Sequence, residues 1–158
     1  MTRPPADDTE LRRLEQLLDE YFARQLQELP IVLDVARDED QPRRWYVRLE
    51  AESREVTTLW FTLGQRTLKY ETYFLPTPVD DPAAVYEFVL RRNYELVGAQ
   101  FGIGPEDALF LTGEVAVHAI DEEELDRVVG TLWEYVERYW STALRLGFGS
   151  VLERSKSD

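Results

Sequence analysis

The feature that most constrains the fold is a run of alternating side chains over residues 55–76, EVTTLWFTLGQRTLKYETYFLP. Large apolar residues occupy every second position on both sides of the Gly64-Gln65 pair, as expected for two strands joined by a tight turn. Threonine, aromatic and β-branched residues, which favour strands, fill many of the remaining positions. The run predicts an antiparallel hairpin, whose core face, with the preceding strand, carries Val47, Leu49, Leu59, Phe61, Leu63, Leu68, Tyr70 and Phe74.

The opposite face of this hairpin also carries large side chains. Together with the preceding strand it collects three aromatic residues and two cations, namely Tyr46, Arg48, Trp60, Lys69 and Tyr73. Tyr, Trp and Arg are over-represented in binding hot spots because they bury much area and keep a hydrogen-bonding end. We predict that these residues bind a partner or a second copy; the alternatives are cover by the same chain and incidental surface aromatics. A register slip of one residue would exchange the two faces.

Periodicity elsewhere in the chain predicts three helices. Apolar residues between positions 11 and 26 repeat at threes and fours, and Asp7 has the position of a helix cap. A second helix is predicted to start at Pro82, because proline suits the first turn of a helix. A third and longer helix is predicted after Asp121.

Five strands are predicted around these helices, in the order α-βββ-α-ββ-α. They are expected at about 45–51, 56–63, 66–75, 99–103 and 108–119. The apolar run 31–35 is interpreted as an extended lead-in to a loop at 36–44. Strands in runs joined by tight turns, with helices between the runs, indicate an α+β fold with one antiparallel sheet.

The 158 residues suit a single domain over 1–158, with flexible ends at 1–8 and about 151–158. The formal net charge of -13 disfavours binding to nucleic acid or to anionic membranes. This charge either serves solubility or attracts a basic partner segment. A cytoplasmic location is expected, because the sequence shows neither a secretory signal nor an apolar run of about 20 residues.

Groups for catalysis or metal binding are sparse. The chain has no cysteine and a single histidine, His118, which is expected near the end of a strand and pointing to solvent. One histidine cannot build a zinc site, and Ser150 has the wrong glycine spacing for a nucleophile elbow. The carboxylates at 80–81 and 122–124 fall at predicted helix starts, where the helix dipole accounts for them. We therefore expect no enzyme activity, no metal and no cofactor.

Three segments of the second half carry a family pattern: VYEFVLRRNYELVGAQFGI (85–103), LTGEVAVHAIDEEELDRVVGTL (111–132) and ALRLGFGS (143–150). With the strand hairpin upstream, the chain resembles the YbjN-domain family, whose members are described as sensory transduction regulators. Their fold is similar to that of type III secretion chaperones. The resemblance covers about 45–154, and it leaves the role of residues 1–44 open.

The resemblance implies a domain that binds protein segments, and it supplies no catalytic residues. It also implies a homodimer, because the chaperone relatives are frequently dimeric and the helix corresponding to 82–97 contributes to their dimers. Four residues off the apolar stripe of this helix are therefore predicted to contact a second copy, with a solvated helix face as the alternative: Tyr86, Arg91, Arg92 and Tyr94.

Two functions from different classes follow from these observations. The first is a non-enzymatic module that binds a protein or peptide, as a chaperone-like or adaptor protein. The second is a regulatory module that senses a small ligand between sheet and helices without catalysis. An enzyme in which His118 acts with a carboxylate is a third and weaker hypothesis.

Overall fold

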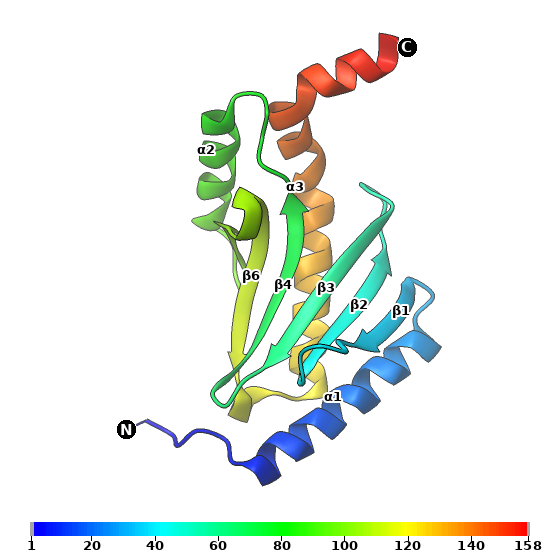
Figure 1. Ribbon diagram of the computed structural model, residues 1–158, viewed down its shortest axis with the longest axis vertical. Helices are drawn as coiled ribbons and strands as arrows, with labels where there is room; N and C mark the ends of the chain where they lie inside the picture. The colour runs from blue at the N-terminus through cyan, green and yellow to red at the C-terminus, as the bar shows by residue number, and fades with distance from the viewer. Residues whose placement is uncertain (1, 158) are drawn as a thin grey trace.

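An antiparallel sheet of six strands is the centre of the computed structural model, which describes residues 2–157 (Figure 1). The strands are β1 (Val32–Arg37), β2 (Arg44–Glu50), β3 (Val56–Leu63), β4 (Thr67–Leu75), β5 (Gln100–Ile103) and β6 (Leu109–Ala116). The helices are α1 (Asp8–Glu28), α2 (Pro82–Asn93) and α3 (Glu122–Ser157), with 3-10 turns η1 (Pro105–Asp107) and η2 (Val117–Ala119). The predicted α+β class with three helices is confirmed.

The predicted number of five strands is wrong by one, because the apolar run read as a lead-in is strand β1. β1 pairs with β2 from Val32↔Leu49 to Arg37↔Trp45, with a register shift between Val32 and Asp34. β1 lies at one end of the strand order β1-β2-β3-β4-β6-β5 and has a single neighbour. The register shift interrupts the alternation that would have marked it as a strand.

The last predicted strand also differs from the structure at its end. β6 stops at Ala116, and His118 lies exposed in the turn η2 rather than in a strand. The Val117 N–H still donates to the Arg66 carbonyl at 2.9 Å, after which the chain turns towards α3.

The helices begin where the capping pattern predicts. The Asp7 carboxylate accepts a hydrogen bond from the Glu10 N–H at 2.8 Å, and Asp121 accepts one from the Glu124 N–H at 2.8 Å. Asp81 caps α2 in the same way, although it adopts a left-handed conformation with φ 38°. Each side chain satisfies an N–H that the first helical turn leaves free.

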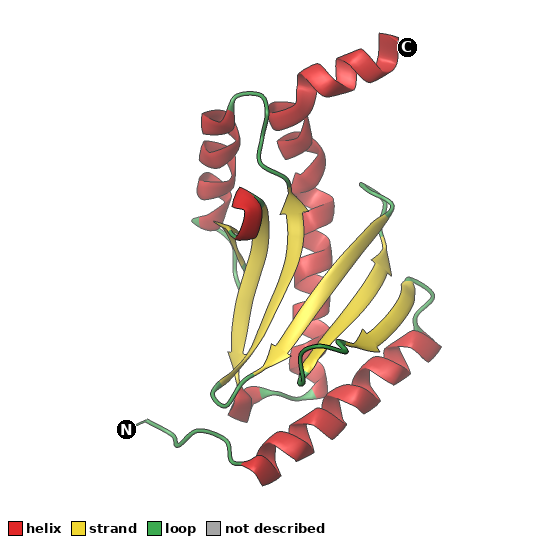
Figure 2. Cartoon of the chain, viewed as in Figure 1, coloured by secondary structure: helices red, strands yellow, loops and turns green. Residues whose placement is uncertain are grey.

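One face of the sheet is covered by α1 and α3, and Figure 2 shows α3 running behind the sheet while the near face carries no long helix. The Phe22 ring of α1 lies 5.0 Å from the Phe61 ring of β3, between their centroids. Buried residues of α3, among them Leu125, Val128 and Leu132, complete the core. The core is therefore a single layer between the sheet and these helices.

The N-terminal segment contacts the body of the fold, whereas the C-terminal end of α3 extends away from it. The Ala6 N–H donates to the Gln65 carbonyl at 2.8 Å, and Ala6 is buried. α3 bends at Phe148 (φ -140°, ψ 21°) and continues as a helical arm to Ser157, which projects from the molecule in Figure 1. Met1 and Asp158, the outermost residues of the segments predicted to be flexible, lie outside the described residues.

Candidate functional site

The open face of the sheet is the face that the described α-helices leave uncovered, and all five predicted binding residues lie on it. Side chains of β2, β3 and β4 alternate between buried and accessible, with Trp45, Phe61 and Tyr70 on the helix-covered side. The strand register assumed from the sequence is therefore the one observed. The five residues on the open face are Tyr46, Arg48, Trp60, Lys69 and Tyr73.

An aromatic pair on β2 and β3 forms the first part of this face. Tyr46 is directly opposite Trp60 in the β2–β3 ladder, and their ring centroids are 5.3 Å apart. The Arg44 guanidinium lies 4.5 Å from the centroid of the Trp60 ring and 3.7 Å from the Glu71 carboxylate. The Tyr46 hydroxyl donates to Asp34 at 3.3 Å. Desolvation, and then the nearby Asp34 carboxylate, raise the pKa of Tyr46, so the hydroxyl stays protonated near neutral pH.

A second aromatic pair lies on β4 and β6. Tyr73 is opposite Phe110, with ring centroids 5.5 Å apart in an edge-to-face arrangement. Tyr73 is 43% exposed, so much of its ring is available to a partner. Partial burial, and then Glu106, raise the pKa of its phenol. The guanidinium of Arg54 donates to the Tyr73 carbonyl at 2.8 Å and holds this strand end in place.

The structure does not gather the five predicted residues into one cluster. Tyr46 and Trp60 are in contact, whereas Tyr73 belongs to the second pair. The exposed cations Arg48 and Lys69 lie apart, opposite Thr58 and Thr62 respectively in the ladder.

Sequence reasoning missed several residues of the open face. Arg44 fell within a segment read as a loop, although it is the first residue of β2. Phe110, Thr112 and Glu114 belong to β6, whose pairing with β4 brings them onto this face. Their alternation with Leu109, Leu111 and Val115 is visible in the sequence, but the sequence does not show that β6 lies beside β4.

The outer surface of α2 is the second predicted contact region. Tyr94 follows the last residue of α2 and is 94% exposed, whereas Tyr86 is half-buried against the core. Arg91 is paired with Glu87 at 2.8 Å, and the Arg92 guanidinium lies 5.1 Å from the centroid of the Phe88 ring. The structure therefore separates Tyr86 from the exposed end of the helix.

Two apolar residues near Tyr94 were not predicted. Leu90 is 65% exposed and Val97 is 73% exposed. Leu90 lies off the apolar stripe of α2 and Val97 lies beyond the end of the helix, so periodicity gave no reason to single them out. With Tyr94 they make the end of α2 and the segment after it unusually apolar for an exposed surface.

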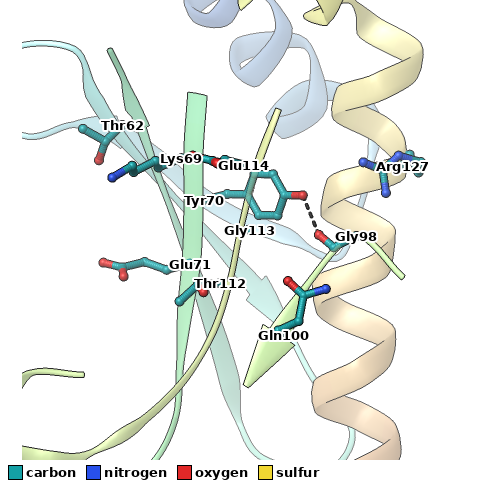
Figure 3. Close-up of a pocket in the computed structure, with 10 residues that line it drawn as sticks. All are labelled: Thr62, Lys69, Tyr70, Glu71, Gly98, Gln100, Thr112, Gly113, Glu114 and Arg127. Carbon is teal, nitrogen blue, oxygen red and sulfur yellow. Dashed lines mark hydrogen bonds between the residues drawn. The ribbon is translucent and has the colours of Figure 1, made fainter. Parts of the chain in front are cut away.

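A cavity of about 750 Å³ lies at the β6 edge of the open face (Figure 3). Lys69, Glu71 and Glu114 line one side of it, and Arg127 of α3 lines the other. The Tyr70 hydroxyl donates to the Gly98 carbonyl at 2.5 Å beside the cavity. Burial raises the pKa of Tyr70, and a hydrogen bond with Arg127 opposes that shift.

The described residues include no group of side chains that could form a metal centre. His118 is exposed in η2. Among residues 2–157, no three His, Cys, Asp or Glu side chains are grouped so that they could hold a metal ion. None of the described helices is both long and apolar enough to cross a membrane.

Comparison with solved structures identifies the class of fold as that of type III secretion chaperones. A chain of the HopA1–SchA chaperone–effector complex superimposes with a TM-score of 0.55 and 17% identity, over 86% of this chain and 98% of that one. A chain of the ExoU–SpcU complex from the type III secretion system of Pseudomonas aeruginosa gives a TM-score of 0.52 and 16% identity, over 77% and 93%. At these identities the likeness concerns the fold alone.

The chain belongs to the YbjN family, "Putative bacterial sensory transduction regulator", which it matches over residues 13–144. Uncharacterized proteins of Mycobacterium tuberculosis and Mycobacterium bovis are each 30% identical to it over 113 residues, which is 72% of this chain. An uncharacterized protein of Mycobacterium leprae is 30% identical over 111 residues. The matches span about 60% of the length of these relatives.

Proposed function

We propose that this chain, as a single domain over 1–158, is a cytoplasmic, non-enzymatic protein-binding module that recognises a polypeptide segment on the open face of its sheet. The observation that carries the proposal is the pair of accessible aromatic clusters, Tyr46 with Trp60 and Tyr73 with Phe110, on a face that none of the three described α-helices covers. The fold class supports it, because both solved neighbours come from complexes of two proteins, one of them a chaperone and its effector.

The chemistry of the open face suits an extended or helical segment with apolar and basic residues. Aromatic rings with hydroxyl or indole N–H groups bury area at low rotamer cost and keep a hydrogen bond available to the partner. A net charge of -13 favours approach of a basic segment. Arg48 and Lys69 would form the rim of the contact and limit which segments fit.

A homodimer formed through the end of α2 is part of the same proposal. Leu90, Tyr94 and Val97 expose apolar surface there, and Arg91 lies beside them. This surface does not overlap with the open face, so one chain can bind a second copy and a partner at the same time. Light scattering on the purified chain would give the molar mass of a dimer, and Tyr94→Ala with Leu90→Ala would shift it towards the monomer.

The test of the open face is recovery of partners from the native host by affinity purification and mass spectrometry. We expect Trp60→Ala with Tyr73→Ala to retain the fold, because neither ring belongs to the core, and to lose the partners that the wild type recovers. The Val79→Ala, Val151→Ala variant is the matched control, since it removes exposed apolar area to which neither the open face nor the proposed dimer contact contributes. Equal recovery by wild type and the open-face variant would count against the proposal.

Sensing of a small ligand without catalysis is the second candidate function. The 750 Å³ cavity at the β6 edge favours it, because the cavity brings Lys69, Glu71, Glu114 and Arg127 within reach of one ligand. A metabolite present at 100 times its Kd would raise the stability of the chain by about 2.7 kcal/mol. A thermal-shift screen would detect such a gain, and no hit in the screen would leave protein binding as the function.

A further inference from the structure

β6 is longer than the strand beside it, so part of its edge has no strand partner. The β5–β6 ladder runs from Ile103↔Leu109 to Gln100↔Thr112, where β5 begins. β6 continues to Ala116, so residues 113–116 have a strand on the β4 side only, within the part of the chain that the structure describes. An unpaired strand edge is a template for pairing with another chain.

The hydrogen-bond phase of the ladder shows which groups face this open side. The Gly104 N–H donates to the Ala108 carbonyl at 2.9 Å. Bonded positions recur at every second residue of an antiparallel strand, so Glu114 and Ala116 are the next residues whose N–H and C=O point away from β4. The Val117 N–H points towards β4 and donates to the carbonyl of Arg66, the residue before β4, as this phase requires.

The segment before β5 lies on the helix-covered side of the sheet and does not pair with residues 113–116. Gly98 has φ 83°, a left-handed conformation that favours glycine, and its carbonyl accepts the hydrogen bond from Tyr70. A Cβ on Gly113 would overlap the Tyr70 ring and lie 2.6 Å from the Gly98 carbonyl oxygen. Gly113 therefore lets this segment pass beneath β6, and the cavity in Figure 3 opens beside it.

The charges at the edge favour one kind of occupant. Glu114 points to the open face and lies opposite Lys69 in the β4–β6 ladder, but within the described part of the chain their side chains do not come within ion-pair distance. In contrast, Glu71, on the neighbouring strand, is paired with Arg44 at 3.7 Å. A second copy pairing through the same edge would bring like carboxylates together, which destabilises a cross-strand pair. A basic residue opposite Glu114 would be stabilised by it and by the overall negative charge of the chain.

We propose that the free edge of β6, residues 113–116, binds an extended basic segment of a partner protein as an added antiparallel strand. The N–H and C=O of Glu114 and Ala116 bind the backbone of that segment, and a Lys or Arg of the segment lies opposite the Glu114 carboxylate. Backbone pairing supplies affinity and the side chain opposite Glu114 supplies selectivity. This edge is separate from the aromatic pairs of the open face, so it adds a second mode of peptide recognition to the proposed function.

The test uses the full chain labelled with 15N and the acetylated, amidated heptapeptide Thr-Val-Thr-Lys-Thr-Val-Thr. We expect the peptide to shift the amide signals of Glu114 and Ala116 and to slow their hydrogen exchange. The matched peptide with Glu in place of Lys should bind about fivefold more weakly, the effect of one cross-strand charge pair. Equal binding of the two peptides, or shifts that leave these two amides unchanged, would overturn the proposal.

Two variants separate the backbone contribution from the charge contribution. Ala116 has φ -61° and ψ 142°, which proline adopts, so Ala116→Pro should fold while losing one outward N–H and bind the Lys peptide about fivefold more weakly. Glu114→Gln should abolish the preference for Lys over Glu, whereas Glu123→Gln, an exposed carboxylate on α3, should keep it. Unchanged peptide binding by Ala116→Pro would contradict strand addition, whatever Trp60→Ala does to partner recovery on the aromatic face.

Discussion

Both faces of the sheet carry several aromatic residues, but those of one face are buried and those of the other are accessible. The helix-covered face carries Trp45, Phe61 and Tyr70, all buried, whereas the open face carries Tyr46, Trp60, Tyr73 and Phe110, none of them buried. Trp60 and Phe61 are both large aromatic residues at adjacent positions of β3, and they point to opposite sides of the sheet. Strand parity, rather than hydrophobicity, therefore decides which rings stabilise the fold and which are available to a partner.

The largest expected difference in the free energy of unfolding is between two variants that each remove one ring, one from each face of the sheet. Phe61→Ala should lower the free energy of unfolding by about 3–5 kcal/mol, because the ring is fully buried beside Phe22 and its removal leaves a cavity. Trp60→Ala should cost about 1 kcal/mol, the scale of a cross-strand pair. Urea denaturation monitored by circular dichroism measures both. Similar losses for the two variants would show that the open face is part of the core.

A smaller difference in stability is expected between alanine substitutions at two glycines at the β5–β6 end of the sheet. Gly113→Ala should destabilise the chain by about 1–3 kcal/mol, since the new Cβ would meet the Tyr70 ring and the Gly98 carbonyl. Gly102→Ala is the matched control, because no described residue other than its chain neighbours lies within 4 Å of the new Cβ, and its effect should stay within about 0.5 kcal/mol. Thermal unfolding of the two variants compares them directly, and a tolerated Gly113→Ala would contradict the close passage beneath β6.

Much of this fold could be predicted because its local signals agree with its packing. β3 occupies residues 56–63 as its alternation predicts, and the carboxylates of Asp7 and Asp121 cap the helices at the expected spacing. β1 could not be recognised in the same way, because its register shift and its single neighbour remove the alternation of a half-buried strand. A local pattern identifies an element only where both faces of that element have distinct environments.

The sequence predicts which residues of each strand point to the open face, but it does not predict which strands lie side by side to form that surface. Trp60 and Tyr46 were placed on one face by parity alone, and they are in contact because β2 and β3 are joined by a short connection. Phe110 is about 37 residues further along the chain from Tyr73, and only the β4–β6 pairing brings the two rings together. Long-range strand order depends on how the helices cross the sheet, and one sequence does not encode it in any local spacing.

The smallest expected change in the free energy of unfolding comes from removing one ion pair on each face of the sheet. Glu15 of α1 accepts hydrogen bonds from Arg43 at 2.6 Å and from Arg37 at 3.4 Å beside the helix-covered face. The open-face pair of Arg44 with Glu71 is longer, at 3.7 Å. Glu15→Gln should therefore lower the free energy of unfolding by about 0.5 kcal/mol and Glu71→Gln by less, as measured by urea denaturation at pH 7.

The pH dependence of the Glu15 effect sharpens that comparison. The hydrogen bond from Arg43, and then that from Arg37, hold the pKa of Glu15 below its ordinary value of 4.5. A carboxylate whose pKa is lower in the folded state contributes its full stability above the unfolded pKa and loses it as the pH falls through the folded value. The difference between wild type and Glu15→Gln should therefore be constant from pH 7 to about 5 and shrink towards pH 3. A difference that persists at pH 3 would mean that Glu15 stabilises α1 by packing rather than by its charge.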